Sequence, residues 1–397
     1  MNFKNLNSPG LVFALNSIYI FHGAASIIIA LNMAFIAAQL ETDILGVAAV
    51  IGARGVGRLI GVPFTGFFKG ARDQKRIILL GVFSMLVFFL GIALTKSLLI
   101  ATVLGALLGF GNTFLDVGVY PAHTELNPKL AGSLSMLTRG FISIGQFLLP
   151  LLVAFIIARN LDYRVSFFLC AAALLFIAIF IAFRQDFGLT TSEIKTKKRA
   201  DLKKLRASFD FRTIAALLFA FFITGTFIIL GQWLPIYAER YGGFSATEAP
   251  VLVSVFGIAS FVSVFATSYF IARLGRSSLI LKLYTILVVV AIGVLLIFET
   301  PLAFFMAAFS IGAFAAAGLW QLVISALLNL HKENKGFMAA AYSASASTAL
   351  MLVPIITAAL ERSDIRNVFI FNFFIALGSF LLAIPLARLL KSETNSN

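Results

Sequence analysis

Four charged residues lie inside long apolar stretches of this chain: Arg54, Arg58, Asp116 and Arg139. A charge at the centre of a bilayer costs about 2.5–3.5 kcal/mol on insertion scales, so each should face protein or a water-filled cavity. One carboxylate among three arginines can form an ion pair, take up a proton or help to bind an anionic solute. No nucleophile, base and orienting group cluster in the sequence, so enzymatic catalysis is not expected.

The positions of these residues predict an ion pair. Arg54 and Arg58 are four residues apart and therefore share one face of a helix. At a rise of about 1.5 Å per residue, Arg58, Asp116 and Arg139 lie at comparable depths in their helices. We therefore expect Asp116 to pair with Arg139 or with Arg58. Such a pair could be a fixed clamp between helices, or it could exchange partners with a proton or a substrate.

Uncharged polar residues extend this candidate cavity. Ser135, Arg139, Ser143 and Gln146 are spaced 4, 4 and 3 residues apart, which places them on one helical face. Asn112 lies one turn before Asp116, and His22 shares a weaker stripe with Tyr19 and Ser26, although a single histidine can also be satisfied locally. The second half of the chain supplies amides, a hydroxyl and an indole: Gln232, Trp320, Gln321 and Ser343. Trp320 could equally serve in packing.

The composition identifies the elements that hold these residues. The chain has 397 residues, of which 60% are hydrophobic and 12% are charged, about half the charged fraction of a soluble domain. Runs of about 20 apolar residues predict membrane-spanning helices, and continuous runs argue against a transmembrane barrel. Glycines 105, 109 and 111 should allow close helix contact. The predicted spans are 11–38, 45–68, 76–95, 98–122, 131–158, 163–184, 213–238, 246–272, 278–298, 301–328, 336–360 and 366–390.

The distribution of basic residues predicts the topology. If both termini are cytoplasmic, 22 of the 31 Lys and Arg lie on the cytoplasmic side and six outside, which is the pattern of the positive-inside rule. The net charge of +14 then needs no nucleic-acid partner. The basic segment 185–212 is interpreted as a cytoplasmic linker, with contact to anionic lipid or a regulatory role as alternatives.

Two patterns indicate that the chain is an internal duplication. Gly132 and Gly336 each precede a proline by 18 residues, and the tripeptide Asp-x-Arg occurs at 162–164 and at 364–366. Two six-helix bundles, 1–184 and 213–397, in the same orientation are therefore expected, related by a pseudo-two-fold axis along the membrane normal. One cysteine and three separated histidines argue against a disulfide framework or a metal site, and no cofactor is expected.

The loop that begins at Gly66 and contains Arg72, Lys75 and Arg76 resembles the loop 2–3 signature of the major facilitator superfamily, although Gly70 stands where the signature has an acid. Arg273, Gly275 and Arg276 resemble its second copy. The resemblance covers the whole chain. It implies a transporter and no enzyme, located as a multi-pass protein in a bacterial inner membrane, where it acts as a monomer.

The run Gly109–Pro121 resembles the fucose permease-like branch, in which a carboxylate at the position of Asp116 is linked to protons. Arg139 stands where that branch has a polar residue implicated in substrate binding. The branch also has a carboxylate in the first span, and this chain has none there. The resemblance implies symport of a sugar or sugar derivative with protons by alternating access, driven by the proton gradient. Two alternatives stay open: an organic-anion/proton symporter, favoured by the three arginines, and a drug or metabolite exporter, which the Phe-rich spans allow.

Overall fold

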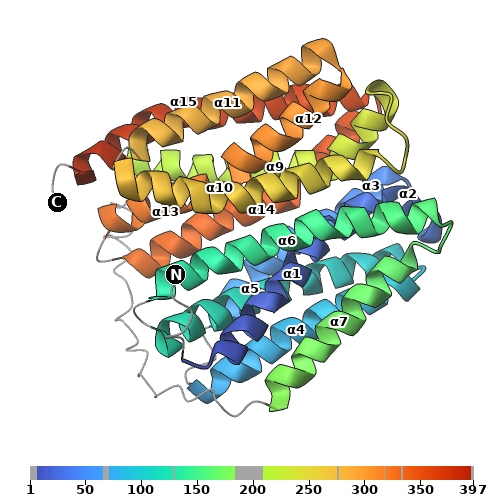
Figure 1. Cartoon of the computed structure of the whole chain (residues 1–397), viewed down its shortest axis with the longest axis horizontal. Coiled ribbons are helices and arrows are strands. Elements are labelled where there is room, and N and C mark those ends of the chain that lie inside the picture. The colour runs from blue at the N-terminus through green and yellow to red at the C-terminus, as the bar shows by residue number, and fades with distance from the viewer. Residues whose placement is uncertain are drawn as a thin grey trace. The chain divides into compact units, whose positions relative to one another are not determined.

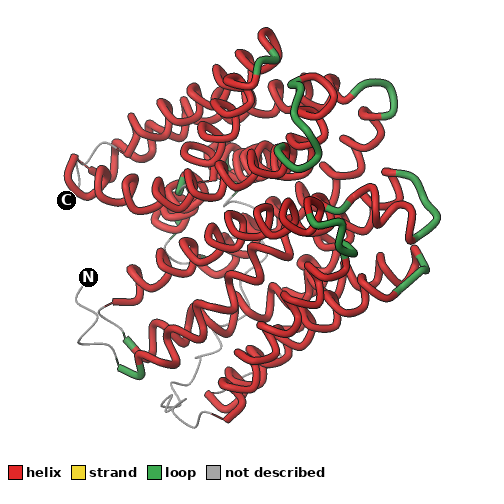
Figure 2. The backbone as a smooth tube through the Cα atoms, turned by 45° about the vertical axis from the view of Figure 1, so that its right-hand side comes forward, coloured by secondary structure: helices red, strands yellow, loops and turns green. Residues whose placement is uncertain are grey.

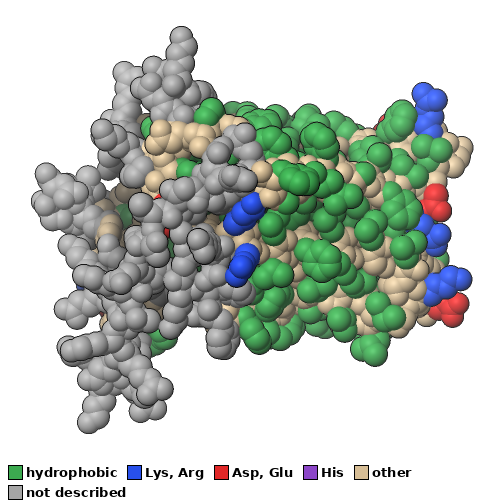
Figure 3. Space-filling view, turned by 90° about the horizontal axis from the view of Figure 1, so that it is seen from below, with side chains coloured by type: hydrophobic (Ala, Val, Ile, Leu, Met, Phe, Trp, Pro, Cys, Tyr) green, Lys and Arg blue, Asp and Glu red, His purple; other side chains and the backbone are tan. Residues whose placement is uncertain are grey.

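The structure is a computed structural model that describes residues 7–65, 71–127, 130–183, 209–274, 277–316, 318–331 and 334–394. These residues form helices joined by short loops, without a strand among them (Figure 2). Twelve helical segments are long and apolar enough to cross a membrane, which confirms the predicted all-α membrane protein. On the face shown in Figure 3, hydrophobic side chains form a broad belt. Side chains of both charges lie at one end of this belt, and further basic side chains lie at its opposite edge.

The chain divides into two units, 1–195 and 196–397. The helices of the first unit (Figure 1) are α1 (Pro9–Leu31), α2 (Met33–Gln39), α3 (Ile44–Thr65), α4 (Ala71–Leu94), α5 (Leu98–Leu126), α6 (Ala131–Ala158) and α7 (Arg164–Phe183). Those of the second are α9 (Phe211–Tyr241), α10 (Ala249–Leu274), α11 (Ser277–Phe298), α12 (Pro301–Ser310), a π-helix (Ile311–Ala316), α13 (Leu319–Leu330), α14 (Lys335–Glu361) and α15 (Ile365–Thr394). Of the predicted linker 185–212, only 209–212 lie within the described residues.

Two spans that the sequence predicts as single helices are interrupted. The first breaks at Asn32, whose Nδ2 donates to the carbonyl oxygen of Ile28 at 2.9 Å. The tenth passes from α12 into a six-residue π-helix and restarts at Leu319. Gly318 precedes this restart with φ of 100°, a left-handed conformation that glycine adopts without steric cost. A hydropathy pattern does not reveal such breaks, because the helical segments on both sides of each break are apolar.

Close glycine contacts place α3 against α5. A Cβ atom at Gly105 would overlap the carbonyl oxygen of Val50, and one at Gly109 would overlap that of Arg54. Lipid provides no hydrophobic force between helices, so such close backbone packing is a main source of helix association in membranes. The predicted role of these glycines in helix contact is confirmed. The same device joins α1 to α6, where a Cβ at Gly23 would overlap the carbonyl oxygen of Ile142.

The start of α9 is held by a side-chain cap. The carboxylate of Asp210 accepts hydrogen bonds from the backbone N–H and the hydroxyl of Thr213, both at 2.8 Å. Partial burial alone would raise the pKa of Asp210, but the two hydrogen bonds, together with the charges of His331 and Arg212, hold this pKa below its usual value. The cap therefore acts through the ionised carboxylate at the positive end of the helix.

In the first unit, the repeated Asp-x-Arg motif ties three helices together at the end opposite residue 9. Asp162 accepts from the backbone N–H of Arg164 at 2.8 Å, which turns the chain into α7. The side chain of Arg164 donates through Nε to Oε1 of Gln39 at 3.0 Å, and the Tyr163 hydroxyl donates to the same oxygen. The Gln39 amide nitrogen in turn binds the carbonyl oxygens of Ile92 and Thr95, at the end of α4, at 2.8 and 2.7 Å.

The second unit repeats this arrangement. Asp364 accepts from the backbone N–H of Arg366 at 2.9 Å, at the start of α15. Glu299, which follows α11, accepts from the Tyr237 hydroxyl at 2.6 Å and pairs with Nε of Arg366 at 3.1 Å. We call the two arrangements the Asp-x-Arg clamps. Each joins the first, third and sixth spans of its own unit, so the duplicated motif has a duplicated structural role.

Candidate solute-binding site

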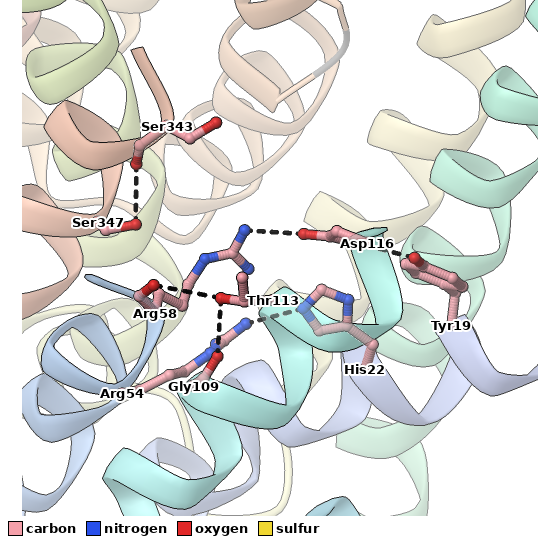
Figure 4. Close-up of polar contacts among 9 residues, drawn as sticks. All are labelled: Tyr19, His22, Arg54, Arg58, Gly109, Thr113, Asp116, Ser343 and Ser347. Atoms are coloured by element: carbon pink, nitrogen blue, oxygen red, sulfur yellow. Dashed lines mark hydrogen bonds and ion pairs between the residues drawn. The ribbon is translucent and has the colours of Figure 1, made fainter. Parts of the chain in front are cut away.

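The first unit contains a polar cluster built from α1, α3 and α5 (Figure 4). Nη2 of Arg58 lies 2.8 Å from Oδ2 of Asp116, and the Tyr19 hydroxyl donates to Oδ1 at 3.1 Å. Of the two ion pairs that the sequence allowed, the structure contains the pair with Arg58. The Arg58 and Asp116 side chains are 21% and 27% exposed, so the pair is largely withdrawn from solvent. Helices α1 and α3 thus each hold one oxygen of a carboxylate from α5.

A second pair in this cluster joins Arg54 to His22. Nη2 of Arg54 lies 3.1 Å from Nε2 of His22. A guanidinium only donates hydrogen bonds, so Nε2 is the acceptor, and the neutral imidazole carries its proton on Nδ1. Nε of Arg54 and Nδ1 of His22 are both buried and have no hydrogen-bond partner among the described residues. The pair therefore holds two N–H donors without an acceptor.

Helix α6 contributes the polar stripe predicted from its spacing. Arg139 interacts electrostatically with His22 and with Tyr120. Ser143 donates to the carbonyl oxygen of Arg139 at 3.3 Å. The amide nitrogen of Gln146 donates to Oγ of Ser26 on α1, also at 3.3 Å. Of the predicted residues of α6, Arg139 therefore lies near side chains of α1 and α5, and Gln146 contacts α1.

Several polar residues around the cluster were not predicted. Tyr120 lies one turn after Asp116, a spacing that could have revealed it. A buried network links three helices: Thr138 donates to Oδ1 of Asn16 at 2.8 Å, and Nδ2 of Asn16 lies 3.3 Å from Nε2 of His123. His123 had no sequence signal, because only the packing of α5 against α1 shows that it has a polar partner.

Other predicted residues occupy buried or half-buried positions with different surroundings. The amide of Asn112 is fully buried and has no hydrogen-bond partner in the described part of the chain. In the second unit, the Gln232 amide is likewise buried without a described partner. The Trp320 ring packs edge to face on Tyr342, with centroids 5.0 Å apart. The Ser343 carbonyl oxygen accepts from Ser347 at 2.8 Å, and Gln321 is half-buried on α13.

A small cavity adjoins the cluster between α1, α3, α4 and α5. Arg54 and Ser26 supply its polar lining, and Val50, Phe88 and Leu108 are among its apolar lining residues. No acidic residue lines it. Over the described ranges, no group of three or more His, Cys, Asp or Glu side chains is placed to hold a metal ion.

Comparisons with known proteins agree with this architecture. The sequence model of the Major Facilitator Superfamily matches residues 15–328 and 243–396. The chain is 30% identical over 381 residues to the inner membrane transport protein YdiM of Escherichia coli, covering 95% of this chain and 93% of that protein. It is 31% identical over 363 residues to YfkL of Bacillus subtilis, an uncharacterized MFS-type transporter, covering 90% and 91%. A D-xylose–proton symporter has the same fold, with a TM-score of 0.72, 15% identity and coverage of 95% and 96%.

Proposed function

This chain belongs to the Major Facilitator Superfamily of membrane transporters, and from that premise we propose that it carries a small polar solute together with protons. Its polar cluster supports transport of a sugar or sugar derivative, because hydroxyl, amide and guanidinium groups from α1, α3, α5 and α6 converge there. The run Gly109–Pro121 resembles the fucose permease-like branch, which favours the same assignment. The fold is also that of a D-xylose–proton symporter.

The surroundings of Asp116 carry the proposal. In the described chain, it is the one acid more than a turn from both ends of a membrane-spanning helix. Its carboxylate is held from two other helices, by Arg58 at 2.8 Å and by Tyr19 at 3.1 Å. A carboxylate in such a position changes its partners when it takes up a proton, because the neutral acid no longer attracts a guanidinium.

In this mechanism, proton uptake by Asp116 changes the contacts between α5 and its neighbours α3 and α1. When Asp116 is ionised, it joins α5 to α3 through Arg58 and to α1 through Tyr19. When it is protonated, Arg58 loses its counter-charge and becomes available to other acceptors. We infer that this exchange links proton binding to solute binding and to alternating access.

The test is transport by the full chain in proteoliposomes. A panel of sugars and sugar acids is screened for uptake under an imposed inward proton gradient. For the solute identified, Asp116→Asn is expected to abolish gradient-driven accumulation while counterflow continues at a measurable rate. If the Asp116→Asn protein still concentrates the solute against its gradient, Asp116 is not the coupling residue and the proposal is wrong.

A further inference from the structure

Arg54 is half-buried, with its Nε fully buried, and no described carboxylate contacts its charge. Its described hydrogen bond goes to the neutral ring of His22. The nearby acid, Asp116, already has Arg58 on one oxygen and Tyr19 on the other. A buried charge is costly unless it is paired and hydrogen-bonded. The surroundings of Arg54 therefore provide one hydrogen-bond acceptor for its guanidinium but no negative charge to balance it.

The hydrogen bonds of this pair show the same deficit. Nε of Arg54 and Nδ1 of His22 are donors without acceptors, as described above. Leaving a buried donor unpaired destabilises the folded protein, and the effect is larger when the group is charged. The unpaired donor of Arg54 needs an acceptor, and the charge on the guanidinium requires that this acceptor be an anion. A neutral hydroxyl compound would satisfy donors but leave the charge of Arg54 uncompensated.

Arg54 also lies at the wall of a small cavity that contains no competing acid. The cavity between α1, α3, α4 and α5 has Arg54 at its wall, and its remaining lining is apolar apart from Ser26. The Ser26 hydroxyl already donates to the carbonyl oxygen of Gly23 at 2.5 Å and accepts from Gln146. Arg54 is thus the group in that lining with a free donor. The low-dielectric surroundings strengthen its attraction for an anion.

We infer that Arg54, with His22 behind it, binds a carboxylate of the transported solute. The substrate class is then a hydroxylated carboxylic acid, such as a sugar acid, and not a neutral sugar. This inference rests on the proposed function, because it names the solute of the same site. His22 keeps the guanidinium in place without neutralising it, a task for which an acidic residue would be unsuitable. A guanidinium binds a carboxylate through two parallel hydrogen bonds, which adds geometric selectivity to the charge.

The experiment measures binding without a proton gradient. The full chain is purified in detergent, and its thermal unfolding is followed with a panel of acids: lactate, glycerate, gluconate and glucuronate. Each acid is compared with its neutral alcohol, so that gluconate is paired with glucitol. We expect at least one acid to raise the Tm while its alcohol does not. Arg54→Gln should weaken the binding of that acid about tenfold or more, and Arg54→Lys should weaken it less, because the charge is kept.

The control is Arg159→Gln, which removes an exposed arginine from the same unit and should leave acid binding unchanged. The inference is overturned if no acid binds, if a neutral sugar binds as well as its acid, or if binding of the acid survives Arg54→Gln. Sodium chloride replaces the acids in a further arm. An equal, Arg54-dependent effect of chloride would show a site for inorganic anions and would also overturn the inference.

These outcomes are separable from failure of the proposed function. A wrong coupling assignment appears as accumulation that persists in Asp116→Asn. A wrong substrate class appears as equilibrium binding that does not depend on a carboxylate or on Arg54.

Discussion

Breaking the pair between Arg58 and Asp116 should destabilise the first unit by an amount that the geometry allows us to estimate. The contact atoms lie 2.8 Å apart, and with charge centres about 4 Å apart the attraction is about 1 kcal/mol in water and about 4 kcal/mol at an effective dielectric constant of about 20. Exposed fractions of 21% and 27% place the pair between these limits. We therefore expect a coupling energy of about 2 kcal/mol.

A double-mutant cycle measures this energy directly. Arg58→Gln and Asp116→Asn should each lower the free energy of unfolding, because each leaves a partly buried charge without its partner. The double variant should be more stable than the sum of the two losses predicts, by about 2 kcal/mol. The assay is reversible unfolding in mixed micelles with an increasing fraction of sodium dodecyl sulfate, followed by circular dichroism.

The control cycle combines Asp116→Asn with Arg159→Gln. Arg159 directly follows α6 and lies over the Phe155 ring, so these two changes should add to within about 0.5 kcal/mol. A coupling energy below about 0.5 kcal/mol for Arg58 and Asp116 would refute the reasoning, because the two side chains would then not be paired in the folded protein.

Two further predictions concern stability. Gly109→Ala should lower the free energy of unfolding by about 1–3 kcal/mol, because its Cβ would overlap the backbone of α3. As a control, Gly293→Ala should be neutral or stabilising in the same unfolding assay, because its Cβ would meet only the Phe373 ring at 3.5 Å. Equal effects at both sites would contradict the close-packing argument. Asp210→Ala should cost about 1 kcal/mol. Because the folded-state pKa of Asp210 is lowered, the cap stabilises the protein above the unfolded pKa of about 3.9, and this stabilisation is lost as the pH falls through the folded value. If the stabilisation by Asp210 were lost at high pH instead, the assignment of an ionised cap would be wrong.

The spans could be predicted because the bilayer imposes a simple requirement of length and polarity. About 20 apolar residues are needed to cross it, and the charges that violate this pattern stand out. Asp116 and Arg58 were recognised for that reason. The breaks at Asn32 and Gly318 were not recognised, because hydropathy averages over a window and does not register a change of backbone conformation at one residue.

The pairing within the cluster could be predicted only in part. Spacing along one helix shows which side chains share a face, but the rotation of each helix about its axis depends on packing. The sequence therefore left Arg58 and Arg139 as equal partners for Asp116 and did not suggest that His22 would accept a hydrogen bond from Arg54. The close contact between α3 and α5 at Gly105 and Gly109 sets the rotation of α3 and hence the direction of both arginines.

The Asp-x-Arg clamps have a consequence for how the protein is made. A membrane protein leaves the ribosome from its N-terminus, so Gln39 is inserted long before Arg164, its partner on the sixth span. Until the sixth span is inserted, the Gln39 side chain lacks this partner, and the Asp-x-Arg clamp of the first unit cannot form. The same holds for Tyr237 and Glu299, which precede Arg366. Each half of the chain must therefore be synthesised to its last helix before its Asp-x-Arg clamp can form. A nascent chain that stops after five spans lacks this clamp, which distinguishes it from a complete unit.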